Sequence, residues 1–78
     1  MIKEFIGLFA DCLEKEPSEV KDTDIFRNYE EWDSLAFLSV LAMINENFDI
    51  TIPREKFDDL KTVSDLYNKI MEIERIYE

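Results

Sequence analysis

The sequence contains no histidine, and Cys12 is its only cysteine. Nucleophilic catalysis by a Ser–His or Cys–His pair within one chain is therefore excluded, as are an internal disulfide and zinc binding through the usual donors. Gly7 is the only glycine, which excludes a glycine-rich phosphate-binding loop. Cys12 lies among apolar residues at helical spacing, and this predicts a thiol in the core. We do not expect the chain to catalyse a reaction alone.

Basic residues are also scarce. Lys and Arg number 9 against 19 Asp and Glu, and the net charge is −10. Such a charge repels nucleic acids and anionic membranes and attracts proteins with positive patches. No run of residues has the length and apolarity of a membrane span, and the first residues lack a signal-peptide pattern. We therefore expect a cytoplasmic protein with protein partners, and the charge favours a monomer.

The apolar residues, 46% of the chain, are enough for a single domain that spans residues 1–78. They recur at three- and four-residue spacing, which is typical of amphipathic helices. The helices expected are residues 2–14, residues 34–47 and a helix from Thr62 whose stripe includes Tyr77, with a short helix at 54–60 after Pro53. The predicted fold is all-α, a small antiparallel four-helix bundle with a long loop between its first two helices.

Residues 17–32 form that long loop, because they show no sustained periodicity. A helical turn is expected after Pro17. Apolar side chains should hold the loop against the core: Val20, Ile25, Phe26, Tyr29 and Trp32. The acidic residues of the loop do not fit an EF-hand, which would need an oxygen ligand where Phe26 stands and glycine where Arg27 stands. A solvated acidic loop is the better interpretation.

The second helix has a core face and a neighbouring strip. On a wheel of about 100° per residue, the expected core face holds Phe37, Val40, Leu41, Ile44 and Phe48. The neighbouring strip holds Leu35, Leu38, Ala42, Asn45 and Glu46. This mostly apolar strip either packs on another part of the domain or docks a partner.

Asp33 and Ser34 stand where the polar loop meets this helix. Asp33 is a good N-cap, because its carboxylate can accept from backbone N–H groups of the first turn. The Ser34 hydroxyl would then lie beside the positive end of the helix dipole, where a phosphate ester is stabilised. Most Asp-Ser pairs at a helix start are simple caps, and capping by Asp33 is compatible with attachment at Ser34.

The order of several segments is more informative than any one of them. The segments are Asp33-Ser34-Leu35, Glu46-Asn47-Phe48-Asp49, Ile50-Thr51-Ile52-Pro53 and Leu60-Lys61-Thr62-Val63-Ser64-Asp65-Leu66. In this order and spacing the chain resembles the acyl carrier protein family, in which a four-helix bundle carries 4′-phosphopantetheine on the Ser of an Asp-Ser-Leu motif. The resemblance covers essentially the whole chain and is tightest from Trp32 to Ile70.

The resemblance implies that a phosphopantetheinyl transferase joins the cofactor from coenzyme A to Ser34. The arm would carry acyl or aminoacyl groups as thioesters and deliver them to acyl-loading and acyl-processing enzymes by a flexible tether. Asp33 would cap the helix and assist the transferase complex. By the same resemblance, partner enzymes with basic or apolar patches would read Leu35, Leu38, Ala42 and Glu46.

Two departures from the family pattern narrow the type of pathway and the mode of partner docking that we expect. Glu31 and Trp32 precede Asp33 where the family often has glycine, and this favours carriers of specialised pathways over the central fatty-acid carrier. Acids are few along the second helix, so docking would rely more on apolar contact. Phenylalanines crowd the expected core, which predicts little room for a long acyl chain. The alternative function is a cofactor-free acidic adaptor with the same fold and a basic protein partner.

Overall fold

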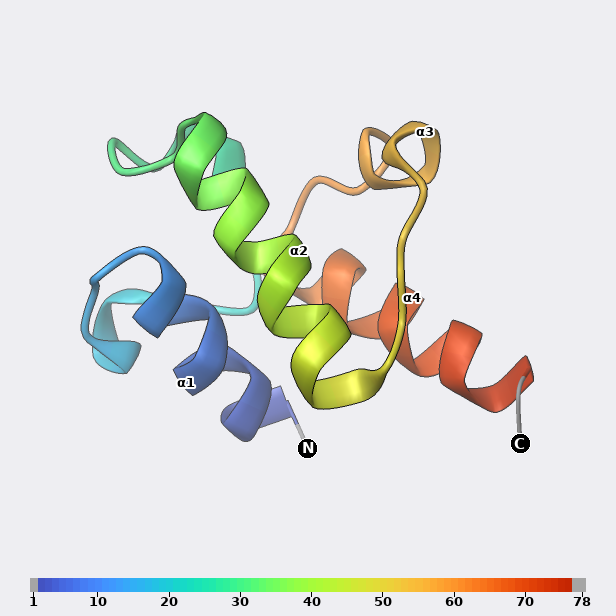
Figure 1. Cartoon of the computed structure of the whole chain (residues 1–78). Coiled ribbons are helices and arrows are strands. Elements are labelled where there is room, and N and C mark those ends of the chain that lie inside the picture. Colours follow the sequence, from blue (N-terminus) through green and yellow to red (C-terminus); the bar gives the residue numbers. More distant parts are fainter. Residues whose placement is uncertain (1, 77–78) are drawn as a thin grey trace.

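The computed structural model describes residues 2–76 and shows a helical bundle (Figure 1). Its α-helices are α1 (Ile2–Cys12), α2 (Ser34–Phe48), α3 (Arg54–Phe57) and α4 (Val63–Ile76), and two short 3-10 helices lie between α1 and α2, η1 (Pro17–Glu19) and η2 (Phe26–Asn28). The predicted all-α bundle with three longer helices, one short helix and a long first connection is confirmed. Tyr77 lies outside the described residues. Within residues 2–76 no helix is long and apolar enough to cross a membrane.

Every α-helix contributes to one apolar core. Phe5 and Phe9 of α1, Ile44 of α2, and Leu66 and Ile70 of α4 are each 1% exposed or less. No polar or charged residue is buried among the described part of the chain. Since full burial of one such side chain contributes about 1.5–3 kcal/mol, this shared core is the main source of stability. The described charged residues are at least partly exposed, although one carboxylate oxygen of Glu74 is buried without a hydrogen-bond partner.

The α1 helix ends at Cys12, two residues before the predicted end. The reason is a left-handed turn at Glu14, where φ is 56°. The N–H of Lys15 donates to the Ala10 carbonyl at 2.9 Å, and the N–H of Glu14 donates to the Asp11 carbonyl at 3.1 Å. This pair of bonds closes the last turn in the manner of a Schellman motif.

The first connection is ordered, as predicted, but one of its expected anchors is wrong. Val20 and Phe26 are buried and a 3-10 turn follows Glu16, whereas the Ile25 side chain is 47% exposed. The backbone explains this difference. The N–H of Phe26 donates to the Lys61 carbonyl at 3.3 Å, and Ile25 forms an isolated antiparallel bridge with Thr62. Backbone pairing with the segment before α4 therefore holds the loop at this point.

The second half of the chain follows the predictions closely. Ile50 and Ile52 anchor the extended connection after α2, with exposures of 5% and 3%. The short helix ends at Phe57, earlier than the predicted residue 60, yet Phe57 and Leu60 are both buried.

At the start of α4, Thr62 and Asp65 form the predicted capping box. The Asp65 N–H donates to Thr62 Oγ1 at 3.0 Å, and the Thr62 N–H donates to Asp65 Oδ2 at 3.1 Å. Each residue thus supplies a partner for the other's backbone, which fixes the first turn of the helix.

The buried face of α2 is rotated relative to the predicted one. Its buried residues are Ala36, Val40, Met43 and Ile44. Phe37, Leu41 and Phe48 were expected on the core face with Val40 and Ile44, but they are only half-buried and pack against the core from its edge. The rings of Phe37 and Phe48 reach sideways instead, to Phe57 at 5.0 Å and to Phe5 at 6.3 Å between ring centres. Phe37, Leu41 and Phe48 thus lie along one border of the buried face, beside Val40 and Ile44.

Candidate functional site

The first turn of α2 presents Ser34 at the surface. Asp33 has an extended backbone, and its Oδ1 accepts from the Ala36 N–H at 2.8 Å, so Asp33 is the N-cap. Ser34 is the first helical residue and its side chain is exposed. Because a carboxylate already caps the helix, the Ser34 hydroxyl is not required for capping. It lies at the positive end of a 15-residue helix.

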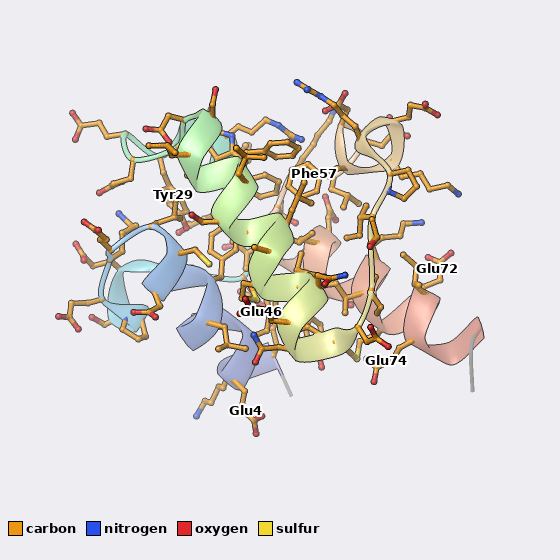
Figure 2. The ribbon with its side chains drawn as sticks, in the orientation of Figure 1. Glu4, Tyr29, Glu46, Phe57, Glu72 and Glu74 are labelled. Atoms are coloured by element: carbon orange, nitrogen blue, oxygen red, sulfur yellow. The ribbon has the colours of Figure 1, made fainter. Side chains whose placement is uncertain are left out.

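An aromatic cluster supports the segment that leads to Ser34. The Trp32 ring is stacked between the rings of Phe9 and Phe57, at 6.4 Å and 6.3 Å with interplanar angles of 13° and 8°. Phe26 packs on the same indole at 4.9 Å. Figure 2 shows Phe57 between the beginning of α2 and α3. Two of these rings, Trp32 and Phe57, line the same depression as Ser34.

Arg27 ties the first connection to α3. Its guanidinium donates to the Leu60 carbonyl and, at 2.9 Å, to the Phe57 carbonyl. It also lies 4.8 Å from the centre of the Phe26 ring. Phe57 is the last residue of α3, and its carbonyl also accepts from the Leu60 N–H at 3.0 Å, whereas Leu60 follows the helix. Sequence reasoning missed this role, because an isolated arginine in a polar loop gives no sign of which carbonyls it will reach.

A small open depression of about 170 Å³ lies next to Ser34. Its lining combines charged residues with aromatic rings: Arg27, Trp32, Asp33, Ser34, Phe37, Arg54, Phe57 and Asp58. The guanidinium carbon of Arg54 is 5.4 Å from the centre of the Phe37 ring. Arg54 was not among the predicted site residues, although its place directly after Pro53 marked the start of the short helix. Figure 1 shows α3 at the end of the molecule where α2 begins.

The strip beside the core face of α2 is open to solvent. Leu35 is 74% exposed and Leu38 is 58% exposed. Ala42 and Glu46 continue this strip and are exposed as well, with Glu46 on the second half of the helix (Figure 2). The strip does not pack on another part of this domain, which was one of its two expected roles. Two large, neighbouring apolar side chains that are exposed to water are typical of a contact surface.

Ion pairs and hydrogen bonds fix the loop before the site. The Tyr29 hydroxyl donates to Asp24 Oδ2 at 2.6 Å, and this bond lowers the pKa of Asp24. Burial, together with the Asp24 carboxylate, raises the pKa of Tyr29 above its usual range. Lys15 Nζ lies 3.3 Å from Glu31 and connects the end of α1 to the same loop. Within residues 2–76 no three His, Cys or acidic side chains are grouped as metal ligands.

Cys12 lies at the border of the core and is half-buried, so its predicted place inside the core is only partly correct. Its Sγ is 3.6 Å from the Ser39 carbonyl of α2. Burial, with a contribution from the Asp11 carboxylate, raises the pKa of the Cys12 thiol. A raised pKa keeps the thiol protonated and weakly nucleophilic.

The described part of the chain is a small helical domain with an exposed serine at the first residue of a largely apolar helix. The profile of the family described as "phosphopantetheine attachment site" matches residues 3–70. The acyl carrier protein of Kocuria rhizophila is 34% identical over 70 residues, which are 90% of this chain and 78% of the relative. The acyl carrier protein of Thermobifida fusca is 34% identical over 70 residues, with 90% and 80% covered. The chain belongs to the acyl carrier protein family, and its cofactor is 4′-phosphopantetheine.

The geometry at Ser34 fits this cofactor. The hydroxyl is exposed, and the depression beside it is open and lined by polar groups, which suits a phosphodiester. Trp32, Phe37 and Phe57 contribute aromatic rings to the lining of this depression. The thiol at the end of the arm supplies the thioester chemistry that Cys12, with its raised pKa, is not suited to provide.

Proposed function

We propose that residues 1–78 act as one carrier domain that bears an acyl or aminoacyl group on 4′-phosphopantetheine attached to Ser34. The observation that carries this proposal is the exposed Ser34 side chain at the first residue of α2, capped independently by Asp33. The chain itself is a carrier and not an enzyme. We place it in the cytoplasm as a monomer, where coenzyme A and partner enzymes can reach it.

The attachment step needs a separate phosphopantetheinyl transferase. In that step Ser34 Oγ attacks the phosphorus that bears the pantetheine in coenzyme A. A new P–O bond to Ser34 forms, the bond to the second phosphate breaks, and adenosine 3′,5′-bisphosphate leaves. The serine proton passes to a base of the transferase. This chain has no histidine to serve as that base, so an outside enzyme is required. Asp33 assists that complex while it keeps the helix capped.

Partner enzymes are proposed to dock on the strip that begins beside Ser34. Leu35 and Leu38 supply the apolar contact, and Ala42 leaves room for a close approach. Glu46 is the one acid of this strip. Docking therefore depends on apolar contact at the strip, while the net charge of −10 steers basic partners toward the protein.

The packing of the core indicates how the cargo is carried. The Trp32 ring stacks with Phe9 and with Phe57, and Trp32 and Phe57 line the depression next to Ser34. The adjacent depression of about 170 Å³ is open to solvent, and Trp32 and Phe57 of this stack form part of its lining. We propose that the acyl group stays outside the bundle, which suits short or polar cargo of a specialised pathway.

Mass spectrometry tests the attachment site. The protein is incubated with coenzyme A and a broad-specificity transferase, and its mass is expected to increase by one phosphopantetheine group. Ser34→Ala should show no increase. Ser39→Ala is the matched control, because Ser39 is also an exposed serine on α2, and it should be modified like the wild type. An unchanged wild-type mass, or modification of Ser34→Ala, would refute the proposal.

A further inference from the structure

Arg54 lies beside the proposed attachment serine. It lines the same depression of about 170 Å³ as Ser34. Its guanidinium carbon stands 5.4 Å from the centre of the Phe37 ring, and Phe37 follows Ser34 by three residues, about one turn of α2. The stacking on Phe37 holds a positive charge at the start of α2, next to the hydroxyl that is proposed to carry a phosphate.

The two arginines of this depression differ in what they bind. Arg27 donates to the Leu60 and Phe57 carbonyls and lies 4.0 Å from Asp58. In the part of the chain that the structure describes, no ion pair and no side-chain hydrogen bond involves Arg54. A guanidinium that lies over an aromatic ring keeps its N–H donors free at its edges. Arg54 is therefore the arginine of the depression with donors to offer.

The two carboxylates of the depression do not accept hydrogen bonds from Arg54. Asp33 Oδ1 accepts from the Ala36 N–H at 2.8 Å, and Asp58 lies beside Arg27. The remaining lining next to Ser34 is aromatic: Trp32, Phe37 and Phe57. An anion at Ser34 would thus lie in the same small depression as one cation, Arg54, that is not paired with a carboxylate.

We propose that Arg54 binds the phosphodiester that joins 4′-phosphopantetheine to Ser34 and fixes the root of the arm on the α3 side of α2. This inference rests on the proposed attachment at Ser34. The planar guanidinium can donate to two phosphate oxygens at once. Arg54 is in this sense a positioning residue, because it holds the arm while the chemistry takes place at the distal thiol.

Two consequences follow for the loaded carrier. The phosphate adds a negative charge to a chain whose net charge is already −10, and a contacting guanidinium offsets that repulsion locally. An arm that leaves toward α3 also does not cover Leu35 and Leu38. The exposed strip then stays open for partner enzymes while the thioester is presented from a defined point.

Nuclear magnetic resonance on the intact protein tests the contact directly. Protein labelled with ¹⁵N is compared before and after modification by coenzyme A and the transferase, with complete conversion checked by mass. The Nε–H resonance of Arg54 is expected to shift on modification. That of Arg27, whose guanidinium is bound to backbone carbonyls, is expected to stay. The ³¹P resonance of the phosphodiester should change position in Arg54→Gln.

A thermal cycle provides a second readout with a matched control. Lys56 is an exposed cation on the same short helix that does not line the depression, so Lys56→Gln removes the same charge nearby. Attachment of the arm should lower the melting temperature of Arg54→Gln by about 2–4 °C more than that of the wild type or of Lys56→Gln. Arg54→Lys should show a smaller loss of melting temperature than Arg54→Gln, because lysine restores the positive charge but not the two parallel N–H donors of the guanidinium.

The outcomes separate the two proposals. An unmodified wild type refutes attachment at Ser34 and this inference with it. A modified wild type whose Arg54 resonance does not move, with equal thermal differences for Arg54→Gln and Lys56→Gln, refutes this inference alone and leaves the carrier function intact. If Arg54→Gln resists complete modification, the wild-type resonances of Arg54 and Arg27 decide the question.

Discussion

The two faces of α2 have opposite surroundings within the same 15 residues. The inner face, with Val40 and Ile44, is 0% exposed and contacts the rest of the bundle. The outer face, with Leu35 and Leu38, is 74% and 58% exposed and contacts no other part of the domain closely. Both pairs are aliphatic, so side-chain chemistry does not distinguish them.

The difference shows that burial determines what an apolar residue of this helix contributes. Inner residues stabilise the fold, since their removal leaves a cavity. Outer residues contribute little to stability, because their surroundings change little on folding. Ser34 and Asp33 lie where the two faces meet at the start of the helix. Substitutions on either face can therefore separate stability from carrier function.

The largest effect is expected on the inner face. Ile44→Ala should lower the free energy of unfolding by about 2–5 kcal/mol, because the site is fully buried and cannot collapse around the missing atoms. Urea denaturation followed by circular dichroism measures this loss. For a domain of this size, the variant should be partly unfolded even without denaturant. A loss below about 1 kcal/mol would contradict the assignment of Ile44 to the core.

A smaller effect is expected at the junction of the two faces. Asp33→Ala removes the acceptor of the Ala36 N–H and should lower stability by about 1 kcal/mol. Asp33→Asn retains the cap, because Asn is an equally good N-cap residue. This variant should melt close to the wild type yet be modified more slowly if the negative charge assists the transferase. Equal rates for Asp33→Asn and wild type would leave Asp33 with capping alone.

Much of the fold could be predicted from periodicity and capping. The four helices, the capping box of Thr62 and Asp65, and the anchors Ile50 and Ile52 all follow from local rules. The errors arose where tertiary packing chose between similar options. Ile25 was expected inside but its backbone pairs with Thr62 and its side chain turns outward.

The rotation of the α2 face has the same origin. A helical wheel places apolar residues on a face by their spacing alone and does not show which of them the neighbouring helices cover. In the structure Phe37 meets Phe57 at 5.0 Å from the side, and the small Ala36 faces the centre. Which ring pairs with which depends on the position of α3, and no local pattern in the sequence contains that information.

The candidate site also combines residues that could be predicted from the sequence with residues that could not. The serine, its capping aspartate and the strip could be proposed from the sequence, because they lie on one element whose periodicity fixes their relation. Arg27 and Arg54 could not, because they reach the site from η2 and α3. Arg27 donates to the Phe57 carbonyl at the end of α3, and Arg54 is the first residue of that helix. The position of α3 beside the start of α2 therefore places Arg54 in the same depression as Ser34.

The dependence of stability on pH is expected to be smaller than the effects of Ile44→Ala and Asp33→Ala. It depends on carboxylates in the first connection and at the start of α4, and not on either face of α2. Backbone N–H groups of Thr62 and Lys61 hold the pKa of Asp65 below its usual value, and the Tyr29 hydroxyl does the same for Asp24. A lowered folded-state pKa adds stability that is complete above the unfolded pKa of about 4 and is lost as the pH falls through the folded pKa.

Urea midpoints should therefore fall as the pH is lowered from about 5 to about 2. Asp65→Asn should be less stable near neutral pH and should show a shallower fall, since one of the responsible carboxylates is gone. The backbone N–H of residue 65 can still donate to Thr62 Oγ1 in this variant, so α4 should be retained. A midpoint that rises on acidification over this range would contradict the role of these carboxylates.

The smallest effect on stability, and the sharpest test of the comparison, is expected on the outer face. Leu38→Gln should change the free energy of unfolding by less than about 0.5 kcal/mol, because the side chain is already 58% exposed. Phosphopantetheine attached to Ser34 should survive this change, and binding to an enzyme that accepts the loaded carrier should weaken about tenfold or more, as for a central apolar contact. Calorimetry of unfolding and titration with that enzyme measure the two quantities. Asn45→Gln, an exposed polar change on the same helix, is the control that should alter neither. If Leu38→Gln lost stability and kept full binding, the outer face would have to be assigned to the fold.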